Sequence, residues 1–179
     1  RVYFDLKEGY EMAAIKRAYR DFARTLEDFS IDKNIRLEMR HNWIDVLKEK
    51  LQILFSTQFS NQEEFTLWHQ STCLHLRQAN QTYKLSQGQA QKWINMTLKY
   101  LFALGEEKIP NICRNYKYFH IPIDNIMMLK LEKYGLPKFD KPWSKVQDYD
   151  SYHNYQVQFR NAFEGRIPMD VEFELFNEQ

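Results

Sequence analysis

The sequence contains few of the residues that mark disulfide-rich or disordered proteins. It has two cysteines, five glycines and five prolines among its 179 residues. The two cysteines, Cys73 and Cys113, exclude a framework of several disulfides and a cluster with four cysteine ligands, and they favour a reducing compartment. Scarce glycine and proline, together with 44% hydrophobic and 16% aromatic residues, exclude a low-complexity chain. We expect an ordered globular protein.

The sequence also has no marked excess of charge and no long hydrophobic run. Lys and Arg number 25 and Asp and Glu number 24, which gives a net charge of +1. The whole molecule therefore has little attraction for nucleic acid, and such binding would need a local patch. No apolar segment approaches the roughly 20 residues that span a bilayer. Residues 1–5 do not resemble the hydrophobic region of a signal peptide. We expect a cytoplasmic protein without membrane contact.

Hydrophobic residues recur every three or four positions along most of the chain, as is typical of amphipathic helices. Asp32 and Asn61 are expected to cap helix starts, and Gly105 and Gly135 to end helices. The sequence predicts a single all-α domain over residues 1–179, with about six or seven helices. Residues 106–120 are expected to be mostly loop, and the acidic C-terminal tail to be partly extended. The expected helices cover residues 8–28, 33–55, 61–80, 93–104, 124–134 and 148–163.

The most specific pattern lies in two short segments. Gly88 and Ala90 precede Lys92 in a turn that opens a helix, and Asp124 follows the apolar segment Ile-Pro-Ile. This pattern resembles the helix-hairpin-helix DNA glycosylase superfamily, whose motif is Leu-x-Gly-Val-Gly-x-Lys followed by an apolar-Pro-Val-Asp segment. Ala90 stands where the family has its second glycine, and Leu85 lies one residue further out. The long interval between Lys92 and Asp124 is similar to that of the archaeal 8-oxoguanine branch. The resemblance covers about residues 65–135.

The resemblance implies a DNA-repair enzyme that excises a modified or damaged base from duplex DNA. Such enzymes turn the target nucleotide out of the base stack. Lys92 would attack the sugar carbon to form a Schiff base, and Asp124 would act as base or as electrostatic partner. No metal ion or organic cofactor is required.

The resemblance also implies where DNA would bind. Main-chain N–H groups at a helix start can hold a phosphate without net basic charge. The residues expected to do so are Gly88, Gln89, Ala90 and Gln91. Aromatic side chains would line the base pocket, and the candidates are Trp68, Trp93, Tyr116 and Phe119.

Other interpretations of the same residues remain open. Asp124 is also an ordinary helix N-cap, and Lys92 could extend its amine from a buried helix toward solvent. Arg114 and His120 resemble the Arg-polar-x4-His motif of HEPN ribonucleases, which implies acid–base chemistry on RNA across a dimer. A third alternative is a non-enzymatic α-helical domain that binds nucleic acid or protein.

Three further groups have ordinary explanations. His69, Cys73 and His75 have partial metal-ligand spacing without a fourth ligand, so a polar cluster is favoured over a metal site. The aromatic residues Tyr152, Tyr155 and Phe159 share one helix face and are expected in the core or at a partner surface. A basic run could contact phosphates or be a solvated face. Its members are Lys130, Lys133, Lys138, Lys141 and Lys145.

Overall fold

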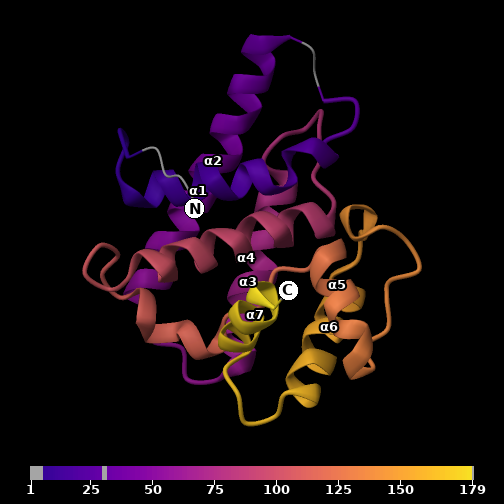
Figure 1. The fold of residues 1–179 in the computed structure, drawn as a ribbon. Coiled ribbons are helices and arrows are strands. Elements are labelled where there is room, and N and C mark those ends of the chain that lie inside the picture. Colours follow the sequence, from indigo (N-terminus) through magenta and orange to yellow (C-terminus); the bar gives the residue numbers. More distant parts are fainter. Residues whose placement is uncertain (1–5, 30–31, 179) are drawn as a thin grey trace.

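The computed structural model describes residues 6–29 and 32–178 of the chain, and residues 1–5 of the expected N-terminal segment lie outside these ranges. The described residues form seven α-helices and four short 3-10 helices, with no strand (Figure 1). This confirms the all-α fold class. In chain order the elements are α1 (Tyr10–Phe22), η1 (Ala23–Thr25), α2 (Lys33–Ser56), α3 (Gln62–Gln78), α4 (Gln87–Leu104), η2 (Ile112–Tyr118), α5 (Asn125–Leu131), η3 (Glu132–Tyr134), η4 (Trp143–Lys145), α6 (Tyr149–Ala162) and α7 (Pro168–Asn177).

Helix α4 is the centre of the molecule. It crosses the middle of Figure 1, with α1 and α2 on one side and α5, α6 and α7 on the other. Every residue of α4 from Gln87 to Leu101 is buried, including charged and amide side chains, because α1, α3, α6, η2 and η4 pack around this helix. Trp93 is fully buried and packs against aromatic rings from α1 and α2. Helices α1, α3 and α6 pack directly on α4, whereas α2 packs on α3, and α5 packs on α7.

The helix ends follow the local sequence signals. The Asp32 side chain accepts hydrogen bonds from the N–H groups of Asn34 and Ile35, and the Asn61 side chain accepts one from Glu64. These bonds satisfy N–H groups that have no partner inside the helix. Gly105 and Gly135 follow helices with φ of 90° and 80°, a region that favours glycine. The expected caps and terminators are confirmed.

Two expectations about irregular segments were wrong. Within the expected loop 106–120, residues Ile112–Tyr118 form the 3-10 helix η2, which buries Ile112 and Tyr116. The acidic tail contains the helix α7 rather than an extended segment, with Pro168 in its first turn. Proline is well suited to that position, since its missing N–H would have no partner there. Apolar residues of α7 are buried, and they stabilise the tail as a helix.

Within the described ranges, no helix has both the length and the apolar character of a bilayer-spanning segment.

Candidate functional site

A cavity of about 480 Å³ is lined by side chains of α1, α4 and α7 and by the start of α5. One face of α4 supplies Lys92, Met96, Lys99 and Ala103, which recur at helical steps of three and four. Five lining side chains are cationic and two are carboxylates, so the cavity favours an anion. The remaining lining residues are Arg17, Arg20, Asp21, Arg24, Tyr100, Asp124, Ile126, Phe173, Phe176 and Asn177.

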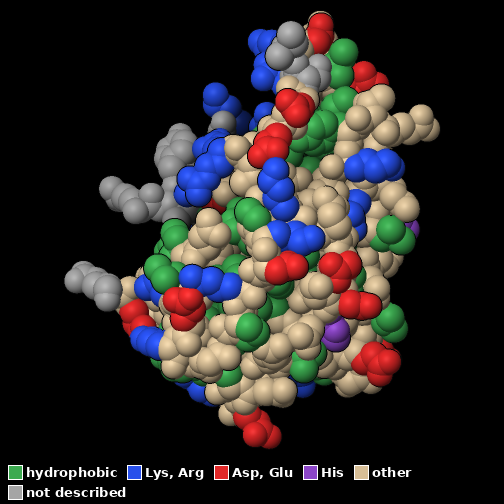
Figure 2. All heavy atoms as spheres, turned by 90° about the vertical axis from the view of Figure 1, so that its right-hand side faces the viewer, with side chains coloured by type: hydrophobic (Ala, Val, Ile, Leu, Met, Phe, Trp, Pro, Cys, Tyr) green, Lys and Arg blue, Asp and Glu red, His purple; other side chains and the backbone are tan. Residues whose placement is uncertain are grey.

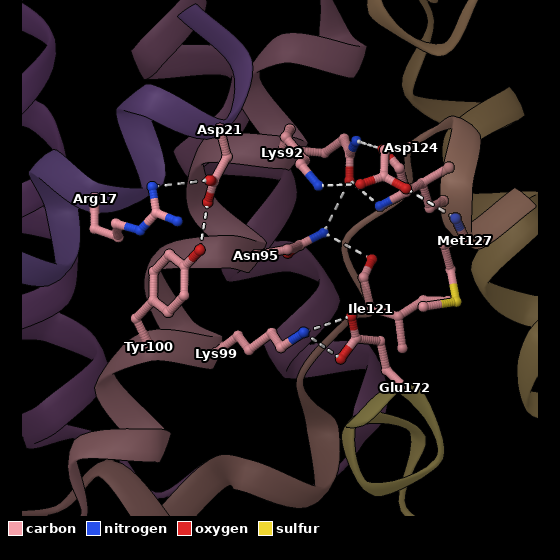
Figure 3. Close-up of polar contacts among 12 residues, drawn as sticks. Arg17, Asp21, Lys92, Asn95, Lys99, Tyr100, Ile121, Asp124, Met127 and Glu172 are labelled. Atoms are coloured by element: carbon pink, nitrogen blue, oxygen red, sulfur yellow. Dashed lines mark hydrogen bonds and ion pairs between the residues drawn. The ribbon is translucent and has the colours of Figure 1, made fainter. Parts of the chain in front are cut away.

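Lys92 and Asp124 meet at the wall of this cavity. The Lys92 ammonium donates a hydrogen bond to the Asp124 carboxylate, and the two form an ion pair (Figure 3). The side chain of Lys92 is 7% exposed and that of Asp124 is 24% exposed. The pair that the sequence singled out is thus assembled in space, with the carboxylate as its more accessible member.

Asp124 also caps α5. Its Oδ1 atom accepts a hydrogen bond of 2.9 Å from the N–H of Met127, while Oδ2 faces Lys92. Burial, the largest influence, would raise the pKa of the Asp124 carboxyl. The charge and hydrogen bond of Lys92, with N–H groups at the start of α5, outweigh burial and hold that pKa below its usual value. Asp124 is therefore held as a carboxylate with one oxygen for each partner.

The chain leading to Asp124 is extended and is fixed by amide side chains. Gln91 accepts from the N–H of Ile123 at 3.1 Å and donates to its carbonyl at 2.8 Å. Gln156 does the same for Ile121, at 3.1 and 2.8 Å, and Asn95 also donates to the Ile121 carbonyl. Side-chain amides here replace the backbone partners that a neighbouring strand would provide. They set the position of Asp124 relative to α4.

A second lysine–carboxylate pair lies deeper in the same region. The Nζ atom of Lys99 is 2.8 Å from each oxygen of Glu172 on α7 (Figure 3). The same ammonium lies 5.0 and 4.3 Å from the ring centroids of Phe173 and Phe176. Burial raises the pKa of Glu172 above its usual value, although Lys99 and Lys92 act in the opposite direction. This pair ties α7 to α4.

Tyr100 closes another side of the cavity. Its hydroxyl donates to Asp21 at 2.6 Å, and Asp21 also lies 3.6 Å from a guanidinium nitrogen of Arg17. Burial, followed by the hydrogen bond to Asp21, raises the pKa of Tyr100. The phenol therefore remains a hydrogen-bond donor at neutral pH.

A buried polar network begins at Asn95, which lies between Lys92 and Lys99 on α4 (Figure 3). The Asn95 amide oxygen accepts a hydrogen bond from His69, and the Asn95 amide nitrogen donates one to the Tyr152 hydroxyl. That hydroxyl is also hydrogen-bonded to His120. Burial lowers the pKa of His69 to about 4 and that of His120 well below its usual value. Both imidazoles are neutral near pH 7, and their nitrogens have partners within the protein. The network joins α3, α4 and α6.

The predicted phosphate donors are not open to a ligand in this structure. Gly88, Gln89, Ala90 and Gln91 are all buried. The N–H of Gly88 donates to the Val146 carbonyl at 3.0 Å, and those of the next two residues bond to Ser86. A β-carbon at position 88 would lie 1.7 Å from a carbonyl oxygen of the segment that covers this turn. This turn therefore packs against protein backbone, and the phosphate role expected for it does not fit.

The four aromatic residues expected at the base pocket are core residues instead. Trp93 and Phe119 are fully buried, and Trp68 and Tyr116 are each 8% exposed. None of the four lines the cavity that contains Lys92. Three aromatic residues do line it: Tyr100 on α4 and, in the tail that was not expected to be helical, Phe173 and Phe176. Only the position of α7 reveals these two phenylalanines.

The alternative pair, Arg114 and His120, does not form an accessible site. Arg114 is exposed, and its guanidinium donates to the Phe55 carbonyl at 3.3 Å and to Asn111 at 3.0 Å. His120 is 1% exposed, and its ring nitrogens bond to Thr66 and Tyr152. An acid–base histidine must reach its substrate, and this one is enclosed.

The other expected groups have structural roles. His69 and Cys73 are buried, with 3.6 Å between the His69 Nδ1 and Cys73 Sγ atoms, whereas His75 is exposed. No three His, Cys, Asp or Glu side chains in the described part of the chain are grouped as metal ligands. Several lysines of the basic run have partners, since Lys133, Lys138 and Lys145 form ion pairs and Lys130 donates to a backbone carbonyl. The aromatic residues Tyr152, Tyr155 and Phe159 belong to the core.

Comparison of the chain with protein-family models, curated proteins and solved structures finds no match.

Proposed function

We propose that this protein is a DNA glycosylase with lyase activity, in which Lys92 is the nucleophile and Asp124 its proton acceptor. The observation that carries this proposal is the ion pair between these two residues on the wall of a cavity large enough for a ligand. A volume of about 480 Å³ falls within the range of about 300 to 1,000 Å³ that is common for small-molecule sites.

The chemistry needs both members of the pair. Attack requires an amine with a lone pair, so the Lys92 ammonium must give a proton to the Asp124 carboxylate. At an abasic site, the amine then adds to the aldehyde carbon of the open sugar. Loss of one water molecule leaves a carbon–nitrogen double bond between the sugar and Lys92. Proton transfer across the existing hydrogen bond supplies the first step without a further group.

The cavity walls suit the two halves of a nucleotide. Met96, Ile126 and the rings of Phe173 and Phe176 provide apolar surface for a base. The guanidinium groups of α1 lie on the opposite boundary, where negatively charged phosphates would be stabilised. A nucleotide turned out of a duplex would thus have its base toward α7 and its phosphates toward α1, with the sugar near Lys92.

Reductive trapping tests the proposal directly. The protein is incubated with borohydride and with labelled duplexes that carry an abasic site or 8-oxoguanine. We expect a covalent adduct on at least one of them, because borohydride reduces the Schiff base to a stable amine. The Lys92→Gln variant should form none.

A matched variant controls for adventitious lysine reactivity. Lys117 is exposed and lies outside the cavity, so Lys117→Gln should trap as well as the unchanged protein. Circular dichroism of all three proteins checks that the fold is retained. Absence of an adduct on both duplexes, or equal trapping by the Lys92→Gln variant, would refute the proposed role of Lys92.

A further inference from the structure

A row of three arginines runs along α1 and into the 3-10 helix η1, and two of the three form no ion pair among the described residues. Arg17, Arg20 and Arg24 follow one another at helical steps of three and four, and all three border the cavity. Arg17 lies beside Asp21, whereas Arg20 and Arg24 are exposed and form no ion pair with any carboxylate in the described residues. Two exposed guanidinium groups without an ion pair among the described residues therefore line the edge of the candidate site.

The basic surface continues from α1 onto α2. A second hollow of about 500 Å³ lies between these helices, and Arg36 and Arg40 line it. The Arg40 guanidinium is 4.5 Å from the ring centroid of Tyr19 on α1. Arg36 is exposed and has no ion pair among the described residues. Figure 2 shows Lys and Arg side chains, with Asp and Glu side chains between them, in the upper half of one face, at the height that α1 and α2 occupy in Figure 1.

Two carboxylates close in sequence to these arginines already have partners. Asp21 accepts the Tyr100 hydroxyl, and Glu27 lies 2.8 Å from the Lys145 ammonium. In the lysine run after α5, by contrast, three members are neutralised by ion pairs. Arg20, Arg24 and Arg36 therefore carry positive charge that no ion pair among the described residues offsets, and the first two border the cavity that contains Lys92.

We infer that Arg20, Arg24 and Arg36 form the surface that binds the phosphodiester backbone of DNA and leads it to the cavity. Guanidinium groups match phosphate oxygens with two parallel hydrogen bonds, and they remain charged at any physiological pH. This surface takes the role that the covered first turn of α4 cannot perform. The inference deepens the proposed function and rests on it for the choice of DNA as the polyanion.

The salt dependence of DNA binding tests this surface. The probe is a short fluorescein-labelled duplex without a lesion, and its affinity is measured by anisotropy over a series of salt concentrations. Each lost phosphate contact should reduce the slope of log K against log salt by about 0.9. We expect a reduction of about 1.8 for Arg20→Gln/Arg24→Gln and of about 0.9 for Arg36→Gln. Because the contacts are to the backbone, a lesion-bearing duplex should show the same reductions.

The control removes two charges elsewhere. Lys133 and Lys138 are exposed and belong to the alternative basic run, but each is paired with a glutamate. The Lys133→Gln/Lys138→Gln variant should therefore keep the slope of the unchanged protein. An unchanged slope in the arginine variants, a reduced slope in the lysine variant, or no DNA binding at all would overturn the inference. Tighter binding to an RNA duplex of the same sequence would overturn the assignment to DNA.

The result can be separated from that of the trapping experiment. If the unchanged protein forms an adduct but the arginine variants keep its salt slope, the proposed reaction stands and the binding surface is wrong. If the arginines set the slope but no duplex is trapped, the surface stands and the proposed reaction is wrong.

Discussion

Lys92 and Lys99 lie two helical turns apart on α4, and each meets one carboxylate, but the surroundings of the two acids differ. The lysines are equally buried, with side chains 7% exposed, whereas Asp124 is 24% exposed and Glu172 only 3%. The pKa of Asp124 is lowered and that of Glu172 is raised. N–H groups at the start of α5 help to hold Asp124 charged, and Glu172 has no such donors. Similar pairs on one helix are thus suited to different tasks.

The difference fits the proposed function, in which the first pair reacts and the second has a structural role. Asp124 is bonded to Lys92 and also lines the cavity, where it is partly exposed. Glu172 is enclosed between α4 and α7, where it fixes the helix that carries Phe173 and Phe176. We therefore expect changes at the first pair to affect chemistry most, and changes at the second to affect the free energy of unfolding most.

The largest expected effect comes from removing Lys99. In Lys99→Met, Glu172 is left buried without its partner, which should lower the free energy of unfolding by about 3 to 5 kcal/mol. In Lys92→Met, Asp124 keeps its helix N–H donors and its access to solvent, so the loss should be about 1 kcal/mol. Urea unfolding of the two variants measures the difference.

The double variant Lys99→Met/Glu172→Leu controls this result. It removes both charges, and replacing a complete buried pair with apolar groups is often neutral or stabilising. Most of the loss in Lys99→Met should then be recovered. Equal losses for Lys99→Met and Lys92→Met would contradict the distinction between the pairs.

A smaller effect should separate the two roles of Asp124. Both Asp124→Asn and Asp124→Ala remove the charge that pairs with Lys92, but only asparagine can still cap α5. The alanine variant should therefore be less stable than the asparagine variant by about 1 kcal/mol in urea unfolding. Asp148 caps α6 in the same way, and the corresponding variants at that position provide the matched reference. A difference at Asp148 with none at Asp124 would show that the cap of α5 adds little.

The sequence predicted the part of this comparison that depends on local chemistry. Hydrophobic spacing and capping residues identified the central helix and most of its neighbours. The resemblance to glycosylases brought Lys92 and Asp124 together as a pair, and the structure places them in contact. Helix starts and caps could be predicted because each depends on only a few neighbouring positions in the sequence.

The rest depends on contacts between segments that are distant in the sequence. Nothing in the first turn of α4 reveals that the segment Trp143–Val146 covers it. The helix α7 was not predicted because acidic residues in a tail suggest an exposed segment. Glu172 is instead buried and is paired with Lys99. Gln91 was expected to offer a backbone N–H to DNA, and its side chain instead positions the segment before Asp124. Such pairings appear only when the helices are packed.

The smallest expected effect lies in the pH dependence of stability, and the two carboxyls should act in opposite directions. Because the pKa of Asp124 is lowered, its carboxylate contributes to the free energy of unfolding above pH 3.8, the ordinary pKa of an aspartate. This contribution is lost as the pH falls through the pKa of Asp124 in the folded protein. Because the pKa of Glu172 is raised, its carboxyl group stays protonated to a higher pH in the folded protein than in the unfolded chain. Its contribution therefore declines as the pH rises from 4.5, its ordinary value, to the raised pKa.

Urea unfolding at a series of pH values between about 3 and 7 measures both contributions when the unchanged protein is compared with Asp124→Asn and Glu172→Gln. The stability advantage over Asp124→Asn should grow with rising pH at the acid end of the series. The advantage over Glu172→Gln should shrink with rising pH above 4.5. If both differences changed in the same direction, the two pairs would respond alike to protons, and Lys92 with Asp124 would be as structural as Lys99 with Glu172.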